Sequence, residues 1–136
     1  MPNIDLSQLV TAEDKQAASR ALIVERILAE RARRLAGGFD YDFGAPAGVH
    51  RIGTSEADLA GWREVTDVAS ALVATGDTTT TITIVTETGA VAVTGPEWQQ
   101  VLIAAAAFRQ PLWAAFFALQ AMDPLPEDVD NDYWWP

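Results

Sequence analysis

The 136-residue sequence contains no cysteine, which excludes disulfides, thiolate metal sites and cysteine nucleophiles. Histidine occurs once, at His50, and no Gly-Lys-Ser or Gly-Lys-Thr pattern of a phosphate-binding loop is present. Basic residues are also scarce. Nine lysines and arginines stand against 19 aspartates and glutamates, which gives a formal net charge of −10. Because such a surface repels phosphate backbones, we expect no nucleic-acid partner.

The chain has the size and apolar content of one domain, since 49% of its residues are hydrophobic. We divide it into an N-terminal arm (1–10), a single domain (11–122) and an acidic, aromatic C-terminal tail (123–136). The arm lacks a basic segment followed by an apolar one, so no secretory signal is predicted. Together with the missing cysteines, this favours synthesis in the cytoplasm.

The first predicted helix begins at Thr11, whose hydroxyl can cap the first turn, and ends at the glycine pair 37–38. Glu30 and Arg34 are spaced to form an ion pair on it. Its apolar residues recur at intervals of three and four and form one stripe, which is predicted to face a core. The stripe consists of Ala17, Ala21, Val24, Leu28 and Leu35. Such a helix packs either on its own domain or on a second copy of itself.

Two further helices are predicted. One begins at Thr54 or Ser55, and the other begins with a Thr-Gly-Pro-Glu capping box at 94–97 and bends or breaks at Pro111. Residues 101–122 have the apolar content of a membrane span, but Arg109 interrupts them, and a lipid-facing charge costs about 2.5–3.5 kcal/mol. We therefore expect a core helix and no membrane partner. Its excess apolar side chains are predicted to pack on the hairpins or on a neighbouring subunit; they are Trp113, Phe116 and Phe117.

Two segments have the pattern of β-hairpins. In the first, aromatic residues alternate with Asp40 and Asp42 before a glycine-rich turn, and residues 49–52 return. In the second, β-branched residues dominate both arms of the segment 82–93. The element order predicts an α+β fold: a long N-terminal helix, then two antiparallel hairpins, which can join into one sheet, alternating with two further helices.

Three stretches together carry a family resemblance: Gly38-Phe39-Asp40-Tyr41 with residues 48–54, the hairpin 82–93, and the helix opening 94–107. In this order they resemble a domain family of unassigned function that is encoded in bacteriophage tail-fibre regions. The resemblance extends from Arg20 to Met122. It implies a location in the virion tail and partners among other phage tail proteins. The surplus apolar and aromatic side chains, rather than the resemblance, predict a homo-oligomer or a neighbouring subunit. The family carries no catalytic signature, and the acidic tail is not part of its pattern.

Few residues are candidates for chemistry. Asp40 and Asp42 lie on one face of a strand, where paired carboxylates either divide acid and base roles or protect a solvent-facing edge. His50 has no partner that the sequence identifies. The alternating aspartates of 128–132 resemble the start of a calcium loop whose glycine and closing glutamate are missing. We therefore expect no catalytic residue, no metal and no cofactor. A glycan- or wall-degrading enzyme using Asp40 and Asp42 is the alternative from another class.

The C-terminal tail ends with three large aromatic residues, Tyr133, Trp134 and Trp135. Such side chains are typical interface anchors, so they are predicted to bind a partner or a neighbouring subunit; the alternative is that they cap the domain's own sheet.

Three arginines near the end of the first helix are the second candidate contact surface: Arg31, Arg33 and Arg34. They either complement the helix dipole or receive a neighbour's acidic tail. The resemblance implies a phage tail protein, and these two surfaces indicate binding, so we expect a phage tail structural or adaptor protein that acts by protein–protein binding. The first alternative is a tail-fibre assembly chaperone.

Overall fold

A computed structural model describes residues 11–136, so the predicted N-terminal arm, residues 1–10, lies outside the described residues. The elements follow in the order α1 (Ala12–Ala36), β1 (Phe39–Asp42), β2 (Val49–Ile52), α2 (Glu56–Ala74), β3 (Thr81–Thr86), β4 (Gly89–Thr94), α3 (Gly95–Gln120) and the short 3-10 turn η2 (Asp132–Trp134). The predicted α+β fold, with its long first helix, two antiparallel hairpins and two further helices, is confirmed.

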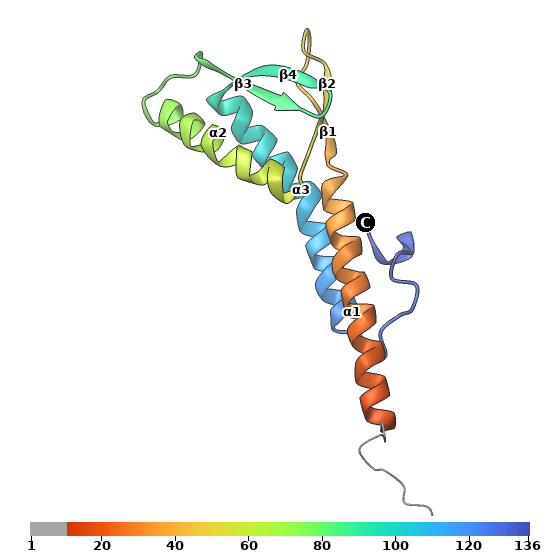
Figure 1. The fold of residues 1–136 in the computed structure, drawn as a ribbon. Helices are drawn as coiled ribbons and strands as arrows, with labels where there is room; N and C mark the ends of the chain where they lie inside the picture. Colours follow the sequence, from red (N-terminus) through yellow and green to blue (C-terminus); the bar gives the residue numbers. More distant parts are fainter. Residues whose placement is uncertain (1–10) are drawn as a thin grey trace, which may run out of the picture.

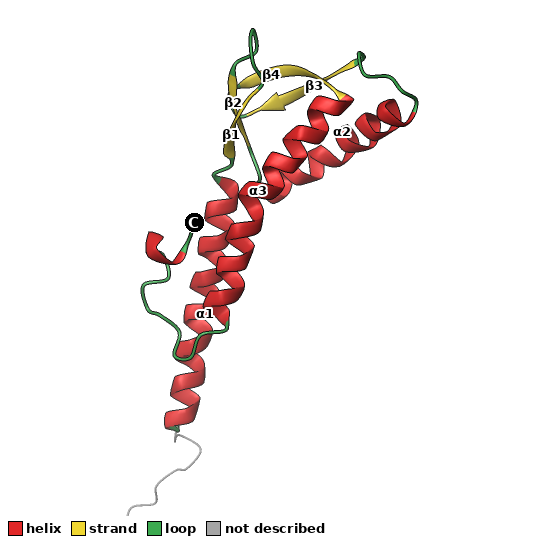
Figure 2. Cartoon of the chain, turned by 180° about the vertical axis from the view of Figure 1, so that it is seen from behind, coloured by secondary structure: helices red, strands yellow, loops and turns green. Residues whose placement is uncertain are grey.

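The molecule is elongated, and α3 runs through most of its length (Figures 1 and 2). Its first part, residues 95–107, packs with α2 and the β3–β4 hairpin; together with both hairpins we call this region the head. Its second part, residues 108–120, packs with α1 and the C-terminal tail (123–136), and we call this region the stalk.

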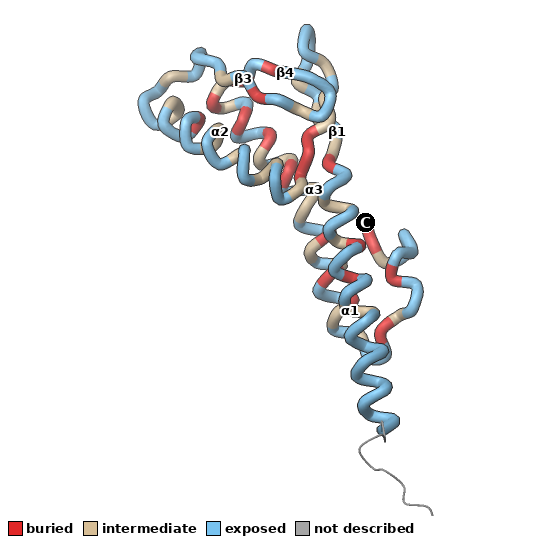
Figure 3. The backbone as a smooth tube through the Cα atoms, viewed as in Figure 1, coloured by how far each residue is buried: buried red, intermediate tan, exposed pale blue. Residues whose placement is uncertain are grey.

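Each region has its own buried core, so buried segments occur in both the head and the stalk, whereas the first turns of α1 are exposed (Figure 3). The head core consists of Ile52, Ala69, Ile84, Val91, Val93, Trp98 and Val101. The stalk core consists of Ile27, Leu112, Phe116, Leu119, Leu125, Val129 and Trp135. One continuous helix contributes to both cores. The position of the head core relative to the stalk core is therefore set by this helix.

All three helices begin with a complete capping box, which confirms their predicted starts. In each box, the hydroxyl of the cap residue accepts a hydrogen bond from the backbone N–H of the residue three positions later. The carboxylate of that later residue accepts a hydrogen bond from the backbone N–H of the cap residue. The pairs are Thr11 with Asp14, Ser55 with Asp58, and Thr94 with Glu97. Of the two candidates for capping α2, Ser55 does so. Thr54 is buried and donates to the carbonyl of Leu35, which ties the head to the end of α1.

The two hairpins form two separate two-stranded sheets rather than one. They meet where β3 turns into β4. There the N–H of Glu87 donates to the carbonyl of Arg51 (3.0 Å), and His50 Nδ1 lies 2.9 Å from the hydroxyl of Thr86. The contact is confined to the turn, so the strand edges do not align into a shared ladder. The β3–β4 hairpin instead lies over α2 and α3.

Of the two outcomes predicted for the third helix at Pro111, a bend or a break, the break does not occur, because α3 continues through Pro111 to Gln120. The helix does change direction in its middle (Figures 1 and 2). Proline lacks the N–H that would bond the carbonyl of Ala107, and it bends rather than ends a helix when both halves are packed. Here the head core holds one half and the stalk core the other. Ala107 is exposed, so water can reach its carbonyl.

The apolar stripe predicted for the first helix is partly wrong. Ile27 is fully buried and Glu30 is 8% exposed. Ile23 and Arg34 are half-buried on the same side, so the buried face follows the spacing 23, 27, 30 and 34. Two of these four residues, Glu30 and Arg34, are charged. A search for apolar residues at helical spacing therefore does not identify this buried face. Three members of the predicted stripe are exposed instead: Ala17, Ala21 and Leu28.

Candidate functional site

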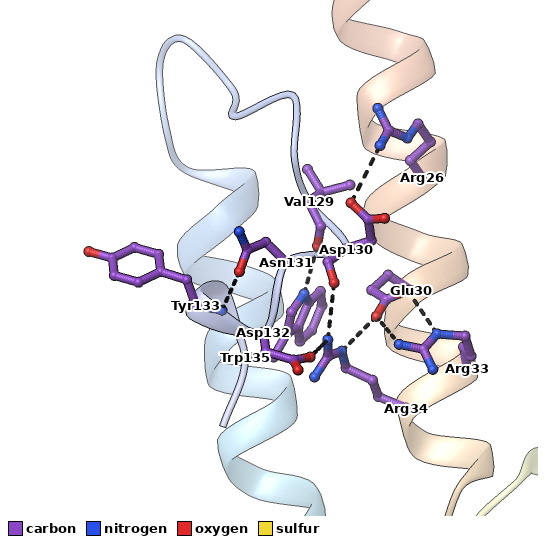
Figure 4. A network of polar contacts seen from close by, with 10 residues as sticks. All are labelled: Arg26, Glu30, Arg33, Arg34, Val129, Asp130, Asn131, Asp132, Tyr133 and Trp135. Atoms are coloured by element: carbon purple, nitrogen blue, oxygen red, sulfur yellow. Dashed lines mark hydrogen bonds and ion pairs between the residues drawn. The ribbon is translucent and has the colours of Figure 1, made fainter.

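Two of the three aromatic residues of the C-terminal tail, Trp134 and Trp135, pack with the helices of the stalk of their own chain. Figure 4 shows Trp135 among the residues of this contact. Trp135 is 6% exposed, and its indole N–H donates to the carbonyl of Val129 at 2.7 Å. The indole N–H of Trp134 donates to the carboxylate of Asp128 at 3.1 Å. Tyr133, by contrast, is 80% exposed. The tail therefore packs within the chain, on α1 and α3, and the alternative that placed it on the sheet is wrong.

Glu30 is the centre of an ion-pair network that joins α1 to the tail (Figure 4). Its carboxylate accepts hydrogen bonds from Arg33 Nε (3.0 Å) and Arg34 Nε (2.7 Å), so the predicted Glu30–Arg34 pair is confirmed. Arg34 also donates to the carboxylate of Asp132 at 2.6 Å. The hydrogen bond from Arg33, with help from Arg34, holds the pKa of Glu30 below its ordinary value of 4.5, although burial opposes this.

The three arginines of the predicted cluster have different partners. Arg33 and Arg34 lie in the last turn of α1, where their charges complement the helix dipole. Arg34 receives an acidic tail, but it is the tail of its own chain. Arg31 instead faces α3, with its guanidinium carbon 4.4 Å from the ring centre of Trp113 and 4.2 Å from that of Phe116. Cation–π stacking of this kind joins the two helices of the stalk.

The first hairpin does not bring Asp40, Asp42 and His50 together as a reaction centre. Asp40 pairs with Arg51 at 3.0 Å, and Asp42 accepts a hydrogen bond from the N–H of Gly44 at 2.8 Å; both aspartates are exposed. His50 faces neutral groups, namely two threonine hydroxyls and the carbonyl of Ala47. The hydrogen bonds of this histidine thus stabilise the junction of the two hairpins.

The alternating aspartates of the tail point to separate partners. Asp128 binds Trp134, Asp130 lies 3.8 Å from Arg26, and Asp132 binds Arg34. Within residues 11–136 no group of three or more carboxylates or imidazoles converges as a metal site would require. Two of these aspartates, Asp130 and Asp132, instead hold the tail against the basic side of α1, and Asp128 forms its hydrogen bond within the tail.

One side of α3 is exposed and free of charge, and it is apolar except for one glutamine. We call it the α3 face; its members recur at helical spacing and are Ile103, Ala106, Ala107, Gln110, Ala114 and Phe117. Ile103 is 62% exposed and Phe117 is 60% exposed. The two charges of α3, Glu97 and Arg109, are each six positions from Ile103, which places them about 120° away around the helix.

The surface of α3 is unusual for a helix of this composition. It is long and apolar enough to cross a membrane, with a mean hydropathy of 1.5 over 18 residues, yet only 22% of that window is buried. The prediction that this segment is a core helix is therefore correct for the buried side of α3 and wrong for its exposed side. Phe116 is buried in the stalk core, and Phe117 packs on neither hairpin and faces solvent.

Comparison of the chain with protein-family models, curated proteins and solved structures finds no match. The resemblance to a phage tail family thus stays a prediction. The sequence reading singled out Phe117 but missed Ile103 and the alanines that continue its face. The sequence does contain a signal for them, because the residues that recur at every third or fourth position from Ile103 along α3 carry no charge.

Proposed function

We propose that this chain is a structural or adaptor protein of a phage tail that acts by binding other proteins, with the α3 face as its main contact surface. The observation that supports this is the exposure of Ile103 and Phe117 on one uncharged side of α3. Contiguous exposed apolar surface of this kind is typical of protein interaction sites.

A second copy of the chain is the occupant that fits the α3 face best. The chain carries a net charge of −10, so two copies repel each other over most of their surfaces. The α3 face carries no charge, so it does not add to this repulsion. Its alanines, such as Ala106 and Ala114, allow a second helix to approach closely, because the distance between packed helices depends on side-chain size.

The mass of the purified chain in solution tests this proposal. We expect the wild type to associate as its concentration rises, and the double variant Ile103→Asp/Phe117→Asp to remain a monomer. Val68→Asp is the matched control, because Val68 is an exposed apolar residue (43%) of α2, outside the α3 face. A wild-type chain that stays monomeric up to millimolar concentration would refute self-association. Binding of the wild type to anionic or neutral vesicles would show that the face meets a lipid surface instead.

The protein composition of purified tails tests the location. A structural or adaptor protein remains in the finished particle of the phage that encodes it, whereas an assembly chaperone leaves before completion. We expect the chain in purified tails, and we expect the Ile103→Asp/Phe117→Asp variant to be absent from them or strongly depleted. Tails that contain neither form would favour the chaperone.

A further inference from the structure

The head contains a groove between the edge of β3 and one side of α2, with a volume of about 550 Å³. Consecutive residues of β3, from Thr83 to Thr86, form one wall, so the backbone of the strand itself lines the groove. The opposite wall belongs to α2, where Gly61 leaves space: a Cβ built there meets nothing within 4 Å. Trp62 and Trp98 pack edge to face between the walls, with ring centres 5.6 Å apart, and supply an apolar floor.

The β3 edge that borders this groove is open. Within residues 11–136 this sheet has two strands, so β3 pairs there with β4 alone. Alternate residues of β3 direct their N–H and C=O groups away from β4. Among the described residues, no backbone hydrogen bond reaches residues 81–86 from the groove side. The strand Thr-Ile-Thr-Ile-Val-Thr also lacks the proline, lysine or bulge that commonly protects an edge.

One end of the groove is negatively charged. The carboxylates of Asp58 and Glu87 both approach Gly53, so closely that a side chain at that glycine would collide with both. Asp58 is used by the cap of α2. Glu87 is exposed and forms no ion pair within the described part of the chain. A cation placed at this end would be attracted by both carboxylates.

The geometry points to a second binding site in this groove, which takes an extended segment of another protein as an added strand on β3. The segment carries β-branched or other apolar side chains toward Trp62 and a lysine or arginine toward Asp58 and Glu87. Main-chain hydrogen bonds to an exposed sheet edge provide affinity in this mode of recognition, and alternate side chains provide specificity.

The donor is not a second copy of this chain. Eight of its nine basic residues lie in helices, and the ninth, Arg51, lies in β2, which is already paired with β1. The required basic strand must therefore come from a different protein. The site is also separate from the α3 face, so the two surfaces allow the chain to bind itself and another partner at the same time.

Selection from a library of short random peptides, displayed and captured by the immobilised full chain, tests the site. We expect the enriched peptides to combine β-branched residues with one lysine or arginine and to lack proline. For these peptides, Gly61→Trp should weaken binding at least tenfold, because the indole fills the groove, and Glu87→Lys should weaken it to a similar extent. Val68→Asp, on α2 outside the groove, and Ile103→Asp/Phe117→Asp are the controls that should leave binding unchanged.

Backbone methylation distinguishes an added strand from any other occupant. In a strand bound at an edge, alternate N–H groups face β3 and the others face solvent. N-methylation of one alternate set of peptide amides should therefore abolish binding, and methylation of the other set should be tolerated. Ala57→Trp fills the same groove from the neighbouring turn of α2 and replaces Gly61→Trp if that variant does not fold. Enrichment of no peptide, equal binding to the filled groove, or equal effects of both methylation sets would overturn the inference.

Discussion

The head and the stalk are built on the same helix but by different means. The head packs α2 and the β3–β4 hairpin against residues 95–107 of α3, with the β1–β2 hairpin beside them, and among the described residues no charged side chain is buried in its core. The stalk packs α1 against residues 108–120 of α3 and then adds the C-terminal tail, whose acidic and aromatic residues bind arginines of α1. The contacts of the stalk join positions about a hundred residues apart, for example Arg20 to the carbonyl of Met122.

This difference shows how apolar burial and charged contacts each contribute to holding the fold together. In the head, capping boxes, turns and alternating strands set the elements, and burial of their apolar sides joins them. In the stalk, α1 has few apolar residues on its inner side, so charge-assisted hydrogen bonds and stacked guanidinium groups accompany the apolar contacts. We therefore expect the head to respond mainly to changes in volume and the stalk to respond also to changes in charge.

The largest effects are expected from truncating one tryptophan in each core. Trp135→Ala in the stalk and Trp98→Ala in the head should each lower the free energy of unfolding by about 3–5 kcal/mol, because each removes a buried indole and its hydrogen bond. Urea unfolding measures both. The exposed Tyr133→Ala should change stability by less than about 0.5 kcal/mol. If Trp135→Ala were as mild as Tyr133→Ala, the tail would not belong to the stalk core.

Hydrogen exchange of the same two variants shows whether the cores unfold together. Because α3 is continuous, we expect Trp135→Ala to accelerate exchange in the head as well as in the stalk. Faster exchange confined to the stalk would show that Pro111 separates two independent units.

An intermediate effect is expected from the ion-pair network. Glu30→Gln should lower the free energy of unfolding at neutral pH by about 1–3 kcal/mol, because it leaves Arg33 and Arg34 with weaker acceptors. The folded chain holds the pKa of Glu30 below 4.5, so its contribution is present above pH 4.5 and is lost as the pH falls through the folded value. Wild type and variant should therefore converge in acid.

Unfolding curves at neutral and acidic pH measure this convergence. Asp40→Asn in the head is the control, because the Asp40–Arg51 pair is largely exposed and such pairs contribute at most about 1 kcal/mol. A difference between wild type and Glu30→Gln that does not depend on pH would contradict the assignment.

The smallest effect is a gain of stability in the head. Gly61→Ala should raise the free energy of unfolding by about 0.5–1 kcal/mol, because alanine stabilises a helix interior and its methyl group meets nothing. Gly95→Ala provides the contrast, since its Cβ would lie 2.9 Å from the carbonyl oxygen of Ala69 where α2 and α3 approach closely. We expect that variant to be destabilised. Thermal unfolding distinguishes the two signs.

The sequence predicts the elements of this fold well and their assembly poorly. The starts of all three helices, both hairpins and the end of α1 depend on residues within a few positions of one another, such as Thr94 and Glu97. The inner side of α1 was missed because Glu30 and Arg34 have the polarity of surface residues. Their burial is explained only by the tail, whose position no local pattern specifies.

For the candidate surfaces, too, the sequence predicts individual residues better than it predicts how those residues are assembled. Phe117 was identified from composition, because one helix carried more apolar residues than one side can bury. The tail aromatics were identified too, but the sequence left open whether they pack within the chain, and Trp135 does so. The groove beside β3 was not predicted, because it depends on the placement of a hairpin against a helix distant from it in the sequence.

The uninterrupted course of α3 through both cores has a geometric consequence. A helix turns by about 100° and advances about 1.5 Å with each residue. Inserting or deleting a single amino acid between Ala105 and Leu112 would therefore rotate one end of the protein relative to the other by more than a quarter of a turn. The direction in which the β3 groove faces, seen along the axis of α1, is thus fixed by the number of residues in this short segment.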